Sequence, residues 1–161
     1  MARPDLLIEQ WLPTKELGIE SVRERAAASA LPPIYFLHVW WARRPLVAST
    51  GAILASLMPA WTPDLAERFA EHSELATNKD YKQWFLRLCG ILGDPIAGRM
   101  RIARANEIGE RLTDGGYGYR QAYKNSPTVA DLNLLHRVLD LVWGRIPTVA
   151  DPTAGGGSIP Y

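Results

Sequence analysis

Apolar residues recur at the spacing of one helix face along most of the chain, and prolines, glycines and capping residues separate these stretches. The clearest stretch begins after Thr128, an N-cap residue, and ends at Gly144, a C-terminal signal. This pattern predicts a helix with one face in a hydrophobic core. Its apolar positions at helical spacing are Leu132, Leu135, Val138, Leu139 and Val142.

Six further stretches carry helix signals of the same kind. Asp5 is placed to cap a short first turn that Pro13 stops, and Thr62 is an N-cap residue followed by Pro63. Pro45 fits the first turn of a helix whose many small residues would permit close packing with a neighbour. We therefore expect helices over residues 6–12, 15–29, 45–58, 63–77, 80–92 and 95–112.

Two stretches favour an extended backbone. Residues 34–41 (IYFLHVWW) are β-branched and aromatic, and predict a short strand or an extended segment. Residues 146–150 (IPTVA) are consistent with a closing strand despite their proline. The expected fold class is mainly α: a helical bundle-like domain over residues 1–145 with at most one or two short strands, followed by a strand and a glycine loop over 146–161.

Composition narrows the class of protein only a little. The chain has 161 residues, enough for one domain with its own core, and 18 basic against 17 acidic residues. This balance gives no global indication of a nucleic-acid-binding protein. The single cysteine, Cys89, lies in an apolar run and is expected to be a buried thiol. With no signal-peptide pattern and no membrane-spanning stretch, we expect a soluble cytoplasmic protein.

The stretch HVWWARRP, residues 38–45, combines two adjacent tryptophans with two arginines before a helix start. Successive side chains of an extended chain point to opposite faces, so one tryptophan can enter the core while the other covers a pocket or a partner. Arg43 and Arg44 beside the first helical amides would suit a carboxylate or a phosphate. The alternative is a tryptophan-anchored core segment with solvated arginines.

The stretch TVADPTAGGG, residues 148–157, has the order of a strand, an acidic residue and a glycine-rich turn. Glycines let a ligand approach the main chain closely, as in nucleotide-binding loops. A flexible C-terminal tail would have the same composition, so the glycines alone leave both interpretations open.

At these residues the sequence resembles a known family. DPTAGGGSIP is similar to the first cofactor motif of amino-directed DNA methyltransferases, written D-P-F-x-G-x-G. The stretches IEQWLPTKEL and LHVWWARRPLVAST resemble the N-terminal region, domain of unknown function 1156, of a group of adenine-specific DNA methylases. The resemblance covers residues 6–58 and 148–160.

The resemblance implies a site for S-adenosylmethionine built from two distant segments. Residues 38–45 match a motif, H-x-x-x-A-[RK]-x-P, that lies against the methionine end of the cofactor in such enzymes, and residues 151–157 match the loop that wraps it. Thr153 departs from the usual phenylalanine, which removes one apolar contact. The cofactor-binding residues implied are His38, Trp41, Ala42, Arg43, Pro45, Asp151, Gly155 and Gly157.

One catalytic motif of that family is missing from the sequence. Amino methyltransferases hold the target base with [DNS]-P-P-[YFW], whereas the only Pro-Pro pair here lies in Leu31-Pro32-Pro33-Ile34. We therefore expect a truncated N-terminal portion of a DNA adenine methyltransferase, inactive alone and completed in cis or in trans, with DNA as partner of the whole enzyme. The alternative is a stand-alone helical binding module or a self-associating, homo-oligomeric one.

Other residues have both a functional and a structural interpretation. Arg101, Arg104 and Arg111 could form one helix face aimed at phosphates, although interleaved glutamates favour a solvated helix with ion pairs. Tyr117 and Tyr119, in a glycine-rich loop, could stack on bases or simply belong to a connection. The remaining two histidines are expected to be structural: a packed His136 and a surface His72.

Overall fold

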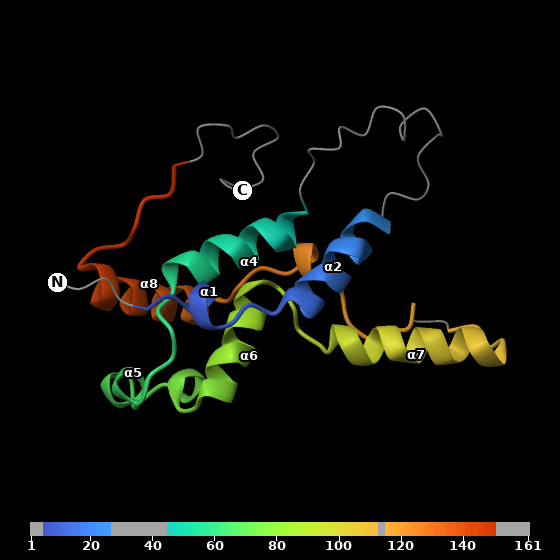
Figure 1. Cartoon of the computed structure of the whole chain (residues 1–161), viewed down its shortest axis with the longest axis horizontal. Coiled ribbons are helices and arrows are strands. Elements are labelled where there is room, and N and C mark those ends of the chain that lie inside the picture. Colours follow the sequence, from blue (N-terminus) through green and yellow to red (C-terminus); the bar gives the residue numbers. More distant parts are fainter. Residues whose placement is uncertain (1–4, 27–44, 113–114, 151–161) are drawn as a thin grey trace.

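The computed structural model describes residues 5–26, 45–112 and 115–150, and over these residues the chain is helical with no strand. This confirms the mainly α fold (Figure 1). None of the described helices is long and apolar enough to cross a membrane. The elements are α1 (Leu7–Gln10), α2 (Thr14–Ala26), α4 (Leu46–Leu57), α5 (Pro63–Arg68), α6 (Asn78–Leu88), α7 (Pro95–Ile108) and α8 (Val129–Trp143), with 3-10 turns η1 (Ser73–Leu75) and η2 (Ala122–Lys124).

Helix α6 carries the largest side chains of the core. Tyr81, Trp84 and Phe85 are fully buried, among apolar residues of α1, α4 and α8. Their polar atoms are paired: the Tyr81 hydroxyl donates to the carbonyl of Pro59 at 2.8 Å, and the Trp84 indole N–H donates to Asp131 at 3.1 Å. The core can therefore bury large aromatic residues without leaving a polar group unsatisfied.

The small residues predicted to allow close packing in the 45–58 stretch do so in α4. A Cβ atom at Gly51 would lie 2.8 Å from Leu17 of α2, closer than real Cβ contacts. The absence of a side chain at Gly51 therefore brings α2 and α4 into direct contact. A short backbone pairing between Leu6 and Pro59 joins the chain before α1 to the end of α4.

The predicted caps at Thr62 and Thr128 are confirmed, because each side chain accepts a backbone N–H of the helix that it begins. Asp94 caps α7 in the same way. The cap predicted at Asp5 is wrong: Leu6 is the N-cap of α1. The helix predicted over 63–77 is also wrong beyond Arg68, where the chain turns, forms η1 and restarts at Thr77, the N-cap of α6.

The strand predicted over residues 146–150 is absent. These residues have no regular secondary structure, and all but Pro147 are exposed. A strand is stabilised by pairing with a neighbour, and the described residues supply no partner strand here. Residues 34–41, the other predicted strand, lie outside the described part of the chain.

Candidate functional site

Of the eight predicted cofactor residues, the structure describes only Pro45. It is the N-cap of α4, half-buried, with φ of −59°. The other seven, His38, Trp41, Ala42, Arg43, Asp151, Gly155 and Gly157, lie outside the described residues. Of this predicted site, the structure therefore describes mainly the elements that flank it.

Those flanking elements lie on one side of the molecule. In the view of Figure 1, the end of α2, the start of α4 and the end of the described segment after α8 all lie along the upper side. The helical body thus presents the three chain positions that border residues 27–44 and 151–161 on a common side.

The amides at the start of α4 are occupied by a carboxylate of the same chain. Glu24 of α2 accepts the N–H of Leu46 at 2.9 Å and the N–H of Val47 at 3.4 Å. Helix N-termini attract anions because their first amides have no partner within the helix. Of the two interpretations left open for residues 38–45, the one in which these amides take an external carboxylate or phosphate is therefore disfavoured, since an internal anion holds them.

A second internal carboxylate, one turn earlier in α2, lies in the middle of that helix. Glu20, 1% exposed, accepts the Tyr119 hydroxyl at 2.8 Å and the Ala122 N–H at 3.0 Å, and it pairs with Arg23. Burial and the hydrogen bond to Glu20 raise the pKa of Tyr119 above its ordinary value. This arrangement keeps the phenol protonated and donating, so the loop before η2 is tied to α2.

Both tyrosines of the glycine-rich loop are engaged within the chain. The Arg23 guanidinium lies 3.8 Å from the centre of the Tyr117 ring and 4.6 Å from that of Tyr119, and it donates to the Tyr119 carbonyl. Glycines make room for both rings: a Cβ at Gly93 would lie 2.2 Å from Tyr119, and one at Gly98 would lie 2.4 Å from Tyr117. The structure thus accounts for both aromatic side chains by packing against α2 and α7.

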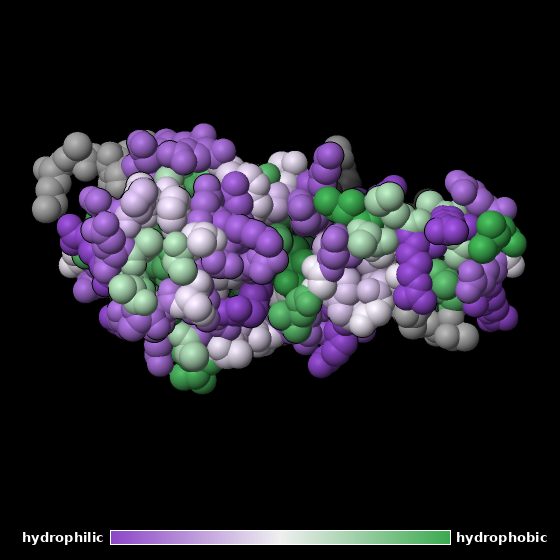
Figure 2. Space-filling view, turned by 90° about the horizontal axis from the view of Figure 1, so that it is seen from below, coloured by the Kyte–Doolittle hydropathy of each residue, from purple (hydrophilic) through white to green (hydrophobic). Residues whose placement is uncertain are grey.

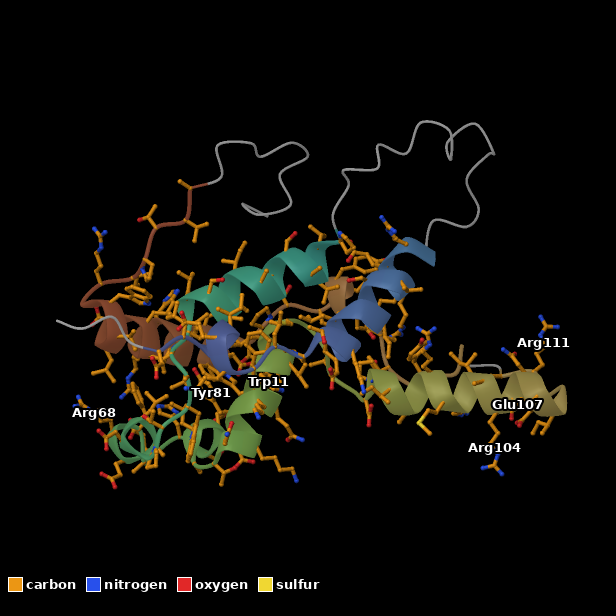
Figure 3. The ribbon with its side chains drawn as sticks, in the orientation of Figure 1. Trp11, Arg68, Tyr81, Arg104, Glu107 and Arg111 are labelled. Atoms are coloured by element: carbon orange, nitrogen blue, oxygen red, sulfur yellow. The ribbon has the colours of Figure 1, made fainter. Side chains whose placement is uncertain are left out.

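Arg101, Arg104 and Arg111 do not form a single helix face, which was the less favoured interpretation of the 95–112 stretch. Helix α7 ends at Ile108, where Gly109 adopts a left-handed conformation with φ of 70°. Figure 3 shows Arg104 and Arg111 pointing to opposite sides of this part of the molecule. Arg101 and Arg104 lie within the helix and are exposed, whereas Arg111 follows the turn.

A charged cluster joins α6, α8 and η1. Asp131, 5% exposed, accepts hydrogen bonds from Arg87 at 2.7 Å and from Trp84 and Thr128, while Arg87 also pairs with Glu74. Burial acts to raise the pKa of Asp131, but the hydrogen bonds from Arg87 and Thr128 outweigh it and lower the pKa below its usual value. Every partner is satisfied, which indicates a structural cluster rather than a reactive one.

A shallow hollow of about 400 Å³ lies at the end of the molecule opposite α7, lined by Arg68, Phe69, Arg137, Asp140 and Leu141. Arg137 donates to Glu71 at 2.8 Å, stacks over Phe69 and lies 2.8 Å from the ring nitrogen of His72. His72 is partly exposed, as expected for a surface residue. The prediction of a packed His136 is wrong, because His136 is exposed and lies off the core face of α8.

Among the described residues no group of histidine, cysteine and acidic side chains could hold a metal ion. Sequence analysis missed Glu20, Glu24 and Asp131, the three carboxylates that organise this structure. Only Asp131 had a local signal, since an acidic residue three positions after Thr128 forms a capping box. Glu20 meets Tyr119 across 99 residues, and no local spacing reports such a pair.

Residues 11–86 match the family described as "Protein of unknown function (DUF1156)". The match covers slightly less than half of the chain and includes α2, α4, α5 and residues 38–45. It supports a domain of unknown function in this part of the protein, in agreement with the resemblance noted for residues 6–58. No curated protein and no solved structure matches the chain significantly.

Proposed function

We propose that this chain is the N-terminal part of an S-adenosylmethionine-dependent DNA adenine methyltransferase, and that it contributes part of the cofactor site without catalysing transfer itself. The observation that carries the proposal is the pair of cofactor-type motifs, residues 38–45 and 151–157, in the order of that enzyme family. The family match over residues 11–86 includes the first motif. The second motif follows the last described residue, Ala150.

The arrangement of the helical body supports a shared site. The described residues that border the two segments lie on one side of the molecule in Figure 1. Helices α2 and α4, which border residues 27–44, meet in close contact at Gly51 and Leu17. Such support is what positions ligand-binding segments that lie between helices.

Glu24 already binds the first amides of α4, and this affects how the carboxylate of the cofactor would be bound. Because Glu24 takes the amides of Leu46 and Val47, the carboxylate of the cofactor would be bound by a side chain and not by this helix N-terminus. Arg43 is the residue of the first motif with a guanidinium fork suited to a carboxylate. Asp151 would accept hydrogen bonds from the cofactor at the other segment.

Calorimetric titration of the chain with S-adenosylmethionine tests the proposal. We expect binding by the wild-type chain and a loss of about 10- to 100-fold in affinity for Asp151→Ala, the range for losing a hydrogen bond to a charged group. Asp64→Ala, at an exposed acidic residue of α5, is the matched control and should bind as the wild type does.

Two results would contradict the proposal. One is the absence of any S-adenosylmethionine binding by the wild-type chain, and the other is equal binding by Asp151→Ala and wild type. A methyl-transfer assay with labelled cofactor and DNA tests the remaining part: transfer by these 161 residues alone would show that they are catalytic, against the proposal.

A further inference from the structure

Helix α7 extends away from the other helices and forms one end of the molecule (Figure 1). It packs mainly against α2, and its only buried residues are the small Pro95, Gly98 and Ala105. A helix that buries so little is exposed on most of its circumference. Because α2 and the loop that carries Tyr117 and Tyr119 hold α7 in place, the helix projects from the body with a defined outer face.

The outer face of α7 carries the residues opposite that buried side. At helical spacing these are Ala97, Met100, Arg101, Arg104, Glu107 and Ile108, all of them exposed. Arg104 points away from the body in Figure 3, with Glu107 next to it, whereas Arg99 lies on a flank of the helix about 100° round from Met100. In Figure 2 hydrophilic and hydrophobic residues lie side by side at the end formed by α7. The face therefore combines two guanidinium groups and one carboxylate, that of Glu107, with the apolar side chains of Met100 and Ile108.

Positive charge is concentrated on this helix. Residues 95–108 contain three arginines and one glutamate, whereas the rest of the chain has 15 basic and 16 acidic residues. Arg99 and Arg104 form no ion pair with any residue that the structure describes. The guanidinium groups of these two residues are available for an external anion, and two such groups on one helix suit a polyanion.

We propose that the outer face of α7 binds the phosphate backbone of duplex DNA. The proposal deepens the proposed function, on which the choice of DNA over another polyanion rests, by naming the surface that would contact it. A helix is about 10–12 Å across with its side chains and the major groove about 12 Å wide, so a projecting helix can lie along the groove. Arginine donates to phosphate in a bidentate manner, and Met100 and Ile108 would contact sugars beside it.

The packing of Tyr117 and Tyr119 within the chain limits the DNA binding proposed here to the phosphate backbone. Tyr117 and Tyr119 are packed against Gly98 and Gly93 and under Arg23, so base stacking by these rings is not part of the proposal. The contacts of α7 are those of a backbone-binding surface, which depends on salt and not on base sequence.

Fluorescence anisotropy with a short labelled DNA duplex, titrated over a series of salt concentrations without cofactor, tests the inference. The variant Arg99→Gln/Arg104→Gln should bind severalfold more weakly. Its plot of log affinity against log salt should be less steep by about 0.9 for each phosphate that the variant no longer neutralises. The control Arg68→Gln/Arg145→Gln removes the same charge from exposed positions outside α7 and should retain the wild-type slope. Circular dichroism verifies that both variants remain helical.

Three results would overturn the inference: no duplex binding by the wild-type chain at low salt, an equal decrease in affinity in both double variants, or binding of polyglutamate as tight as binding of DNA. The last would assign the face to a polyanion-binding role without preference for nucleic acid. Titration of Arg99→Gln/Arg104→Gln with S-adenosylmethionine separates the two proposals, since loss of DNA binding alone concerns α7 and loss of cofactor binding alone concerns the two motifs.

Discussion

At the scale of single residues, the structure depends on carboxylates that are buried and fully paired. Asp131 accepts hydrogen bonds from Arg87, Trp84 and Thr128. Glu20 accepts them from Tyr119 and Ala122. A buried charge is tolerated only with such partners, and removing one partner leaves the others unsatisfied. Cys89 behaves in the opposite way: burial among apolar groups raises its pKa to about 12, which makes the thiol unreactive in the folded chain.

Asp131 gives the stability of the fold a dependence on acid pH. Its pKa is lowered in the folded state, so its contribution is fully present above the unfolded pKa of about 4 and is lost as the pH falls through the folded value. Asp131→Asn should lower the free energy of unfolding at pH 7 by about 2 kcal/mol, the size of a charged hydrogen bond. Urea unfolding at pH 7 and pH 3 should show the difference from wild type narrow at the lower pH.

Asp140→Asn is the matched control, because Asp140 is an exposed residue of the same helix. It should leave the free energy of unfolding within a few tenths of a kcal/mol of the wild type. A deficit in Asp131→Asn that is equally large at pH 3 and pH 7 would show that the ionised carboxylate is not what stabilises α6 against α8.

At the scale of elements, local signals predicted where most helices begin, and long-range packing decided the rest. Caps such as Thr62, Asp94 and Thr128 act within three residues, so the sequence reports them directly. The packing of Tyr119 depends on Glu20, 99 residues earlier in the chain, and no local spacing reveals it. The predicted cofactor site is built on two segments outside the described residues, and it stays a prediction.

Two glycines within helices predict opposite responses to the same substitution. Nothing lies within 4 Å of a Cβ at Gly18 of α2, so Gly18→Ala should raise the free energy of unfolding by about 1 kcal/mol through helix propensity. A Cβ at Gly98 of α7 would lie 2.4 Å from Tyr117, so Gly98→Ala should displace that ring from Arg23 and lower stability by about 1–2 kcal/mol. Denaturant unfolding followed by circular dichroism measures both. Equal stabilisation by the two substitutions would contradict the close packing of Tyr117 on α7.

At the scale of the whole molecule, the chain divides into a core around α6 and a projecting helix attached by polar links. The core buries Tyr81, Trp84 and Phe85, whereas α7 is attached mainly through α2 and through the loop that carries Tyr117 and Tyr119. Stability need not be uniform in such an arrangement, since elements with few buried apolar contacts open before the core. A surface for DNA on α7 and a cofactor site beside α4 would then lie on parts of unequal stability.

Tyr119→Phe tests this division, because it removes the hydroxyl that donates to buried Glu20 and keeps the ring. Losing that hydrogen bond costs about 1–2 kcal/mol, which corresponds to about a tenfold faster hydrogen exchange where opening depends on it. We expect the loss of protection in α7 and residues 115–122, with the amides of α6 and α8 unchanged. Tyr123→Phe, at an exposed tyrosine of η2, should change neither region. Faster exchange throughout α6 and α8 in Tyr119→Phe would instead show that α7 opens only together with the core, and that the molecule is one cooperative unit.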